Sequence, residues 1–330
     1  DRVQPLSIQL PVAHRSNPLA LRLWKPSIPR GDRLWIALMP GLGGSPDHLQ
    51  WLARHLATAG WPVVLLEHPG SDAAAVQALL DGRESFDGAR ALQQRQRDLE
   101  AVLQAQDQKR LPLQGDRVVL LGHSMGALTA LVAAGNRPQS GMERRCRQAL
   151  ADLPLTNLSR LLQCELVERG ALRSRSRMVT PAAVVGLNSL GSLIWPGQPS
   201  IPQPNPLLLI GGTLDLVTPP LDEQIGLLAA LGQHPASRVV VIEGASHFSP
   251  IRVGESAVRS RDDDLFRLGE EFVGVNPQRV QAVIAHEVVE FLSGLSTDAV
   301  PAVDQHWSDR GVRWHRFTGA GAEELRREYQ

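Results

Sequence analysis

One stretch of the chain decides the fold: Val118-Val119-Leu120-Leu121-Gly122-His123-Ser124-Met125-Gly126-Ala127. Its apolar first half predicts a buried strand over residues 117–121, and the alanine-rich run from Ser124 to about residue 135 predicts a helix. Between them, the pattern Gly-x-Ser-x-Gly places the serine on a sharp strand-to-helix turn, where its hydroxyl projects from the end of the sheet. The alternative, a simple turn with a surface serine, does not account for the strand before it and the helix after it.

The rest of the chain alternates short apolar runs with longer amphipathic runs, which is typical of strand–helix units in a mostly parallel sheet. We expect an antiparallel edge from strands 7–12 and 19–24. The further strands are expected at residues 34–39, 61–66, 117–121, 182–187, 207–210 and 239–242. Helices are expected at residues 46–59, 86–105, 124–135, 220–231 and 278–292.

Two segments fall outside this alternation. Residues 137–180 are rich in arginine and contain no strand-like run, so we predict a helical cap inserted into one domain that spans residues 1–294. Residues 295–330 show little pattern, and we expect a C-terminal tail that packs on the body or is partly disordered.

The only two cysteines, Cys146 and Cys164, flank two short predicted helices joined by residues 153–156. A helical hairpin would bring their Cα atoms within bridging distance, whereas the alternative is two unrelated buried thiols. A disulfide would favour a periplasmic or secreted location, and its absence a cytoplasmic one.

A glycine-rich loop, Pro40-Gly41-Leu42-Gly43-Gly44, follows the strand at residues 34–39. Glycines allow backbone N–H groups to point into a pocket without side-chain obstruction. Together with a nucleophilic serine, the loop predicts an oxyanion hole built from the N–H groups of Leu42 and Met125. A phosphate-binding loop fits less well, because neither of the common glycine patterns for nucleotide phosphates is present.

A carboxylate and a histidine follow the last two predicted parallel strands: Asp215 after residues 207–210, and His247 after residues 239–242. Both would emerge at the same edge of the sheet as Ser124. A serine hydroxyl is a weak nucleophile, so His247 would take its proton, and Asp215 would orient the imidazole. Two other acids compete with Asp215. Asp222 falls inside a predicted helix, and Glu243 precedes the histidine loop too closely.

Further residues are expected at the substrate pocket. His123 lies in the serine turn with its side chain predicted to point away from the hydroxyl, and His68 follows the strand at residues 61–66. Gly41, Gly43 and Phe248 complete the expected pocket. No group of histidines, cysteines and acids has the spacing of a zinc site, and the chemistry requires no metal or cofactor.

Composition argues against two classes of partner. Lys plus Arg equals Asp plus Glu at 34 each, which gives no electrostatic reason to expect nucleic acid or an anionic membrane surface. No apolar run approaches the roughly 18 residues of a membrane span. The hydrophobic fraction of 43% is typical of a globular protein with a sizeable core. The sequence specifies no oligomeric state.

The motifs taken together resemble a bacterial group of predicted dienelactone hydrolases. They are Pro40-Gly41-Leu42-Gly43-Gly44, Glu67-His68-Pro69-Gly70-Ser71-Asp72, Gly122-His123-Ser124-Met125-Gly126 and Glu243-Gly244-Ala245-Ser246-His247-Phe248. The group is similar to platelet-activating-factor acetylhydrolases and polyester-degrading hydrolases. The resemblance covers about residues 34–294 and includes the region of Leu161-Leu162-Gln163-Cys164, which looks like the cap of that group.

The resemblance implies the α/β-hydrolase fold, a mostly parallel sheet flanked by helices, with a small helical cap. Two departures stand out: Pro40-Gly41 occupies the place of the usual His-Gly, and a serine replaces the cysteine nucleophile of true dienelactone hydrolases. We therefore expect a serine hydrolase that cleaves a small-molecule carboxylic ester through an acyl-enzyme. The alternatives are hydrolysis of a thioester, peptide or carbon–carbon bond, and a non-catalytic binding protein.

Overall fold

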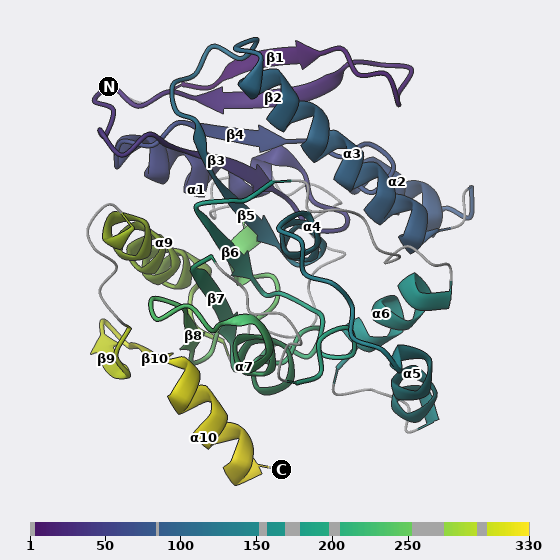
Figure 1. The fold of residues 1–330 in the computed structure, drawn as a ribbon, viewed down its shortest axis with the longest axis vertical. Coiled ribbons are helices and arrows are strands. Elements are labelled where there is room, and N and C mark those ends of the chain that lie inside the picture. The colour runs from purple at the N-terminus through teal and green to yellow at the C-terminus, as the bar shows by residue number, and fades with distance from the viewer. Residues whose placement is uncertain are drawn as a thin grey trace.

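A central sheet organises the computed structural model, which describes residues 4–83, 86–151, 157–168, 179–197, 205–252, 274–295 and 302–329. In these residues ten strands join in the order β1-β2-β4-β3-β5-β6-β7-β8-β10-β9 (Figure 1). The strands are β1 (Leu6–Leu10), β2 (Leu19–Trp24), β3 (Leu34–Met39), β4 (Val63–Leu66), β5 (Arg117–His123), β6 (Ala183–Leu187), β7 (Leu207–Gly212), β8 (Arg238–Ile242), β9 (Gln305–Asp309) and β10 (Val312–Phe317).

The six strands from β4 to β8 in this order run parallel, and antiparallel pairs close both edges. β1 and β2 form the predicted antiparallel edge, where β2 pairs with β4. At the other edge β10 pairs antiparallel with both β8 and β9. The expected mostly parallel sheet is therefore present, and the order of its strands brings the carboxyl ends of β5, β7 and β8 to one edge.

Helices cover both faces of the sheet. They are α1 (Pro46–Thr58), α2 (Ala73–Leu80), α3 (Gly88–Asp107), α4 (Met125–Ala133), α5 (Met142–Ala151), α6 (Ser159–Glu168), η1 (Pro220–Ile225), α7 (Gly226–Leu231), η2 (Ser249–Ile251), α9 (Pro277–Gly294) and α10 (Gly319–Tyr329). Figure 1 shows α1 and α9 on one side of the sheet, and α3 and α4 on the other.

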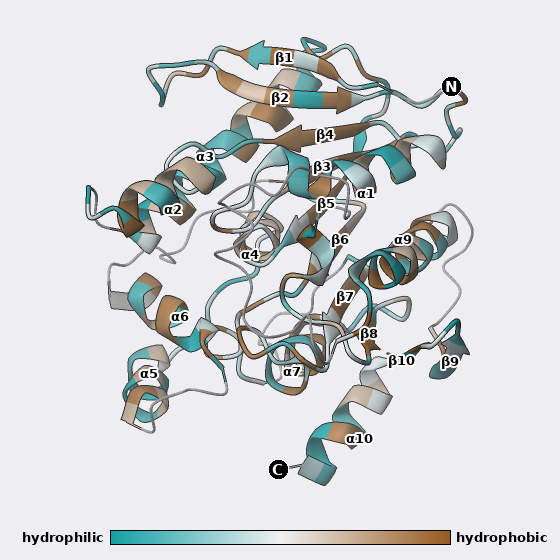
Figure 2. Ribbon diagram, turned by 180° about the vertical axis from the view of Figure 1, so that it is seen from behind, coloured by the Kyte–Doolittle hydropathy of each residue, from teal (hydrophilic) through white to brown (hydrophobic). Residues whose placement is uncertain are grey.

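Two hydrophobic cores result, one on each face. In β3, Ile36 and Leu38 face the core shared with α1 and α9, whereas Ala37 and Met39 face the core shared with α3 and α4. Neighbouring residues of a strand point to opposite faces, so a strand covered on both sides must be apolar throughout. Figure 2 shows this apolar character along β4 and β7. It explains why the continuous apolar runs of the sequence predicted these strands.

The structure differs from the sequence-based expectation in three places. Residues 73–80 form the unpredicted helix α2, which is capped by Asp72. The helix expected over residues 220–231 begins as the wider turn η1 before it continues as α7. In the C-terminal tail, residues 305–329 form β9, β10 and α10, and β10 extends the central sheet.

The predicted cap contains two helices, α5 and α6, which are joined by a disulfide between Cys146 and Cys164. Their Cα atoms lie 5.5 Å apart, within the usual range for such a bond. The expected linker at residues 153–156 lies outside the described residues. α6 also contacts the start of α3, where Glu165 accepts a hydrogen bond from the backbone N–H of Gly88. The segment of α5 and α6 is thus attached to the start of α3.

Candidate active site

Ser124 lies on a strained turn between β5 and α4. Its φ of 52° and ψ of −117° are unusual for a residue with a side chain. The flanking glycines make the turn possible. A Cβ on Gly122 would lie 2.2 Å from the backbone of Gly126, and one on Gly126 would lie 2.3 Å from the carbonyl oxygen of Met39. The predicted strand–turn–helix is therefore present, with the serine held out from the end of the sheet.

The three residues predicted as a triad meet at this edge. His247 Nε2 lies 3.0 Å from Ser124 Oγ, and His247 Nδ1 lies 3.0 Å from Asp215 Oδ2. Asp215 and His247 are both buried, and their separation of 32 positions accommodates η1, α7 and β8. The geometry permits proton transfer from the serine to the imidazole, and the carboxylate fixes which ring nitrogen carries the other proton.

Asp215 is held by more groups than the sequence suggested. Its Oδ1 accepts from the backbone N–H groups of Val217 and Thr218, and its Oδ2 accepts from Thr218 Oγ1 and Asn188 Nδ2. Burial alone would raise the pKa of Asp215, but the charge and hydrogen bonds of His247 and the bonds from Thr218 outweigh it. The pKa therefore lies well below its usual range, and the carboxylate stays ionised.

The two competing acids lie in other interactions. Asp222 is in η1 and pairs with Arg160 of the cap, 3.3 Å away. Glu243 pairs with His315 and Arg313 of β10. Neither carboxylate contacts His247 in the described structure, so Asp215 alone of the three is placed to orient the imidazole.

The predicted oxyanion loop is packed against the serine turn. A Cβ on Gly41 would lie 3.1 Å from the Cβ of Ser124, a contact tight enough that the neighbouring atoms would have to shift by a few tenths of an ångström. Within the described residues, the N–H groups of Leu42 and Met125 donate no hydrogen bond. Gly43 differs, because its N–H donates to Ser71. One N–H of the loop and one at the start of α4 are therefore left without an acceptor among the described residues, and their role as an oxyanion hole stays a prediction.

His123 is buried beneath the site rather than open to it. Its Nε2 lies 2.9 Å from the carbonyl oxygen of His247 and must donate there, because a carbonyl is only an acceptor. Burial, followed by the nearby His247, lowers the pKa of His123 to about 3, so the ring is neutral. Through this hydrogen bond the His123 side chain holds the backbone of the histidine loop.

His68 is also buried, in a polar cluster centred on Asp98 of α3. Its Nδ1 lies 2.9 Å from Asp98 Oδ2, and the same carboxylate binds Arg15 through two hydrogen bonds and His14 through one. Burial, followed by the charge of Arg95, lowers the pKa of His68 to about 4. Phe248 is half-buried, with its ring edge-on to His247 at 5.3 Å between centroids.

The cap is bonded to the loop that carries Asp215. The backbone N–H groups of Leu158 and Ser159 donate to Leu216 and Val217. Below them, the fully buried Glu223 accepts hydrogen bonds from cap and body. Its donors are Asn157, Ser159, Gln163, Gly191 and Ser192. The position of Asp215 thus depends on the hydrogen bonds that Leu158 and Ser159 make with the residues that follow it.

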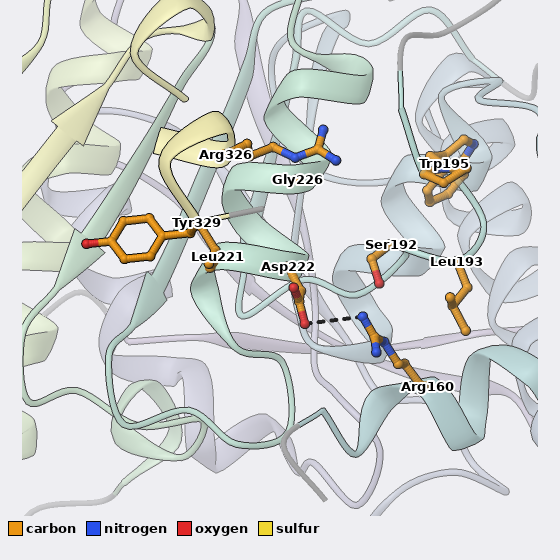
Figure 3. Close-up of a pocket in the computed structure, with 10 residues that line it drawn as sticks. Arg160, Ser192, Leu193, Trp195, Leu221, Asp222, Gly226, Arg326 and Tyr329 are labelled. Carbon is orange, nitrogen blue, oxygen red and sulfur yellow. Dashed lines mark hydrogen bonds and ion pairs between the residues drawn. The ribbon is translucent and has the colours of Figure 1, made fainter. Parts of the chain in front are cut away.

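Two cavities lie near these elements. The larger, of about 720 Å³, is lined by Leu42 of the oxyanion loop, by Val76 and Leu79 of α2, and by residues of α3 such as Arg90. The smaller, of about 220 Å³, lies between α6, η1 and α10, where Arg160 and Asp222 pair across it (Figure 3). No member of the triad lines either cavity, but Leu42 of the oxyanion loop lines the larger one, so the larger is the nearer of the two to the candidate chemistry.

One group of side chains in the described structure has a spacing that could hold a metal: His286, Glu287 and Glu290 of α9. Arg316 of β10 binds both carboxylates, at 2.8 Å each, and so offsets part of their charge. Trp314 also donates to Glu287. The cluster is therefore accounted for by the packing of β10 on α9. No helix in the described part of the chain is long and apolar enough to cross a membrane.

Comparison with known proteins agrees with this architecture. No curated protein sequence matches the chain. Among solved structures, a dienelactone hydrolase from Anabaena variabilis is similar over 89% of this chain and 98% of its own, with a TM-score of 0.50 and 19% sequence identity. At that identity the likeness concerns the fold. A family model described as alpha/beta hydrolase matches residues 36–259, more than half of the chain. The chain therefore belongs to the alpha/beta hydrolase family.

Proposed function

We propose that this protein is a serine hydrolase that cleaves carboxylic esters. The observation that carries the proposal is the continuous chain of contacts from Asp215 through His247 to Ser124, with 3.0 Å at each step. Ser124 would attack the ester carbonyl while His247 takes its proton, and the N–H groups of Leu42 and Met125 would bind the oxyanion. Water activated by His247 would then release the acid from the acyl-enzyme.

The substrate would occupy the cavity beside Leu42. Its volume of about 720 Å³ suits a small molecule, and Leu42, Val76 and Leu79 offer apolar surface for a short or medium acyl chain. The side chain of Met125 is fully buried, so that residue would contribute through its backbone only. The mechanism uses no cofactor or metal.

The first experiment measures hydrolysis of p-nitrophenyl acetate and labelling by a fluorophosphonate. Ser124→Ala should abolish both, whereas Ser308→Ala, on the exposed strand β9, should match the wild type. Asp215→Asn should lower kcat about 10⁴-fold because the wrong imidazole tautomer is favoured. Asp222→Asn serves as its matched control and should retain activity.

The outcomes separate the alternatives. Labelling without turnover of p-nitrophenyl esters would keep the nucleophile and point to a thioester, peptide or carbon–carbon bond. Neither labelling nor turnover by the folded wild type would refute the enzyme proposal and favour a binding protein.

The disulfide supports a periplasmic or secreted location, because such bonds persist in oxidising compartments. Thiol titration of the denatured protein purified without reductant should find no free thiol. Two reactive thiols in protein isolated from its native compartment would contradict this location.

A further inference from the structure

Arg95 is a fully buried arginine whose guanidinium joins two loops of the candidate site. It lies on α3. Its Nη1 donates to the carbonyl oxygen of Pro40 at 2.5 Å, and its Nη2 donates to that of Gly41 at 2.8 Å. The other two bonds go to Ser71: Nε donates to Oγ at 2.8 Å, and Nη2 donates to the carbonyl oxygen at 3.3 Å. All four bonds therefore end on the oxyanion loop or on the loop after β4.

The bond to Gly41 sets the direction of the predicted oxyanion donor. In a planar trans peptide, the C=O of one residue and the N–H of the next point in opposite directions. Because the carbonyl of Gly41 points at Arg95, the N–H of Leu42 must point away from Arg95. Gly41 also packs against Ser124, and the Leu42 N–H has no acceptor among the described residues.

Backbone bonds between the two loops lock this arrangement. Gly43 N–H donates to the carbonyl oxygen of Ser71 at 2.9 Å, and Gly44 N–H donates to that of Gly41 at 3.1 Å. The Gly41 oxygen therefore uses both of its lone pairs, one for Gly44 and one for Arg95. Rotation of the Gly41–Leu42 peptide would break both bonds, and the buried guanidinium would lose one of its four hydrogen bonds.

The charge of Arg95 is available to the site. No described carboxylate bonds directly to its guanidinium, because Asp98, one helical turn away, is bound to Arg15, His14 and His68. Burial lowers the pKa of Arg95 to about 9, against the opposing charges of Asp98 and Asp72, so the group remains a cation at neutral pH. A buried cation that is bound only by neutral oxygens lowers the stability of the fold, because its desolvation is not offset by an opposite charge. A role in function would explain why such a group is present.

We propose that Arg95 is the positioning residue of the oxyanion hole. By holding the Gly41 carbonyl it aims the Leu42 N–H at the tetrahedral intermediate, and it places a positive charge one peptide away from the developing oxyanion. The inference rests on the ester hydrolysis proposed above. Arg95 touches no reacting atom and acts through the loop.

The test compares the wild type with Arg95→Met, Arg95→Lys and the control Arg97→Met, an exposed position of the same helix. Three quantities are measured: kcat and KM for p-nitrophenyl acetate, the Ki of a trifluoromethyl ketone that forms a tetrahedral adduct with a serine, and the urea midpoint of unfolding. Arg95→Met should lower kcat about 100-fold, the typical effect of losing one oxyanion donor, with KM changed less than about threefold. The Ki should rise by a similar factor.

Arg95→Lys keeps the charge but has no planar fork to bind both carbonyls, so its kcat should lie between the wild type and Arg95→Met. Arg97→Met should equal the wild type. If Arg95→Met does not fold, Ser71→Ala replaces it as the test, because it removes one acceptor of the guanidinium. This variant should lower kcat about fivefold and raise the Ki of the ketone by a similar factor.

Three results would overturn the proposal. One is a folded Arg95→Met with wild-type kcat, and another is a Ki for the ketone that does not change while kcat falls. The third is a Ser71→Ala variant with unchanged kcat, where Arg95→Met fails to fold. An inactive, unlabelled wild type would refute the proposed ester hydrolysis itself, and the two failures are therefore distinguishable.

Discussion

Two buried neutral histidines should make the fold sensitive to mild acid. His68 has a folded-state pKa of about 4 and His123 one of about 3, against 6.5 for the unfolded chain. Between these values the unfolded state binds more protons than the folded state, so the free energy of unfolding falls as the pH is lowered. The contribution of the two neutral histidines to the free energy of unfolding is fully present above pH 6.5. It is lost progressively as the pH falls towards 4 for His68 and towards 3 for His123.

The size of the effect follows from the same values. At pH 5 each histidine should lower the free energy of unfolding by about 2 kcal/mol relative to its value at a pH well above 6.5. The two together should lower it by about 4 kcal/mol. Asp98 does not contribute in this range, because its pKa falls from 3.8 in the unfolded chain to about 2 in the fold. Burial also lowers the pKa of His55 and His234, to a smaller degree, so substitutions are needed to isolate the two sites.

The assay is urea unfolding followed by circular dichroism at pH 7.5 and pH 5. The midpoint should fall by roughly 1 M for the wild type. His68→Gln and His123→Gln should each be less stable at pH 7.5, but each should lose about half of the difference between the two pH values. His286→Gln, on the exposed face of α9, should keep the full difference. Equal pH dependence in the wild type and both buried-site variants would refute the reasoning.

Three further predictions concern the site and the cap. Thr218→Val removes one hydrogen bond to Asp215 while keeping the side-chain volume, so kcat should fall about tenfold with KM unchanged. An unchanged kcat would show that the other hydrogen bonds are enough to hold the carboxylate. Gly41→Ala would place a Cβ 3.0 Å from His123 Nδ1 and displace the oxyanion loop, so kcat should fall at least about tenfold, and Gly31→Ala, in open space, is the control. Replacing Cys146 and Cys164 together by serine should lower the free energy of unfolding by about 3 kcal/mol, measured by urea unfolding. The prediction is contradicted if the urea midpoint changes no more than it does in the exposed control Ser308→Ala.

The sequence predicted the parts of the fold whose signal is local. The strand over residues 34–39 was confirmed at both ends, because a strand covered on both faces must be apolar throughout. The mostly parallel sheet and the hydrolase family were confirmed as well. The positions predicted for Ser124, Asp215 and His247 follow from strand ends, and the structure brings these side chains together at one edge. Their catalytic roles, like the likeness to acetylhydrolases, stay predictions.

The residues that hold the site in place were missed because their contacts are distant in the sequence. Arg95 and Pro40 are 55 positions apart, and Asn188 and Asp215 are 27 apart, so no spacing rule links them. A signal for β10 did exist: Val312 and Trp314 alternate with polar residues, the pattern of a half-buried strand. At Pro40, where the sequence departs from the usual His-Gly, Arg95 binds the carbonyl oxygens of Pro40 and Gly41.

The pairing of β10 with β8 has a consequence for aggregation. A chain that ended after α9 would leave β8 as an open edge, with five buried residues and unpaired backbone groups directly before the His247 loop. Such an edge is a template for pairing with another chain. Among the described residues the outermost strand at this edge is β9, which is short and mostly exposed, and which carries polar side chains such as Gln305 and Asp309. The C-terminal segment thus covers an apolar sheet edge that could pair with another chain, and it leaves a polar edge strand that resists such pairing.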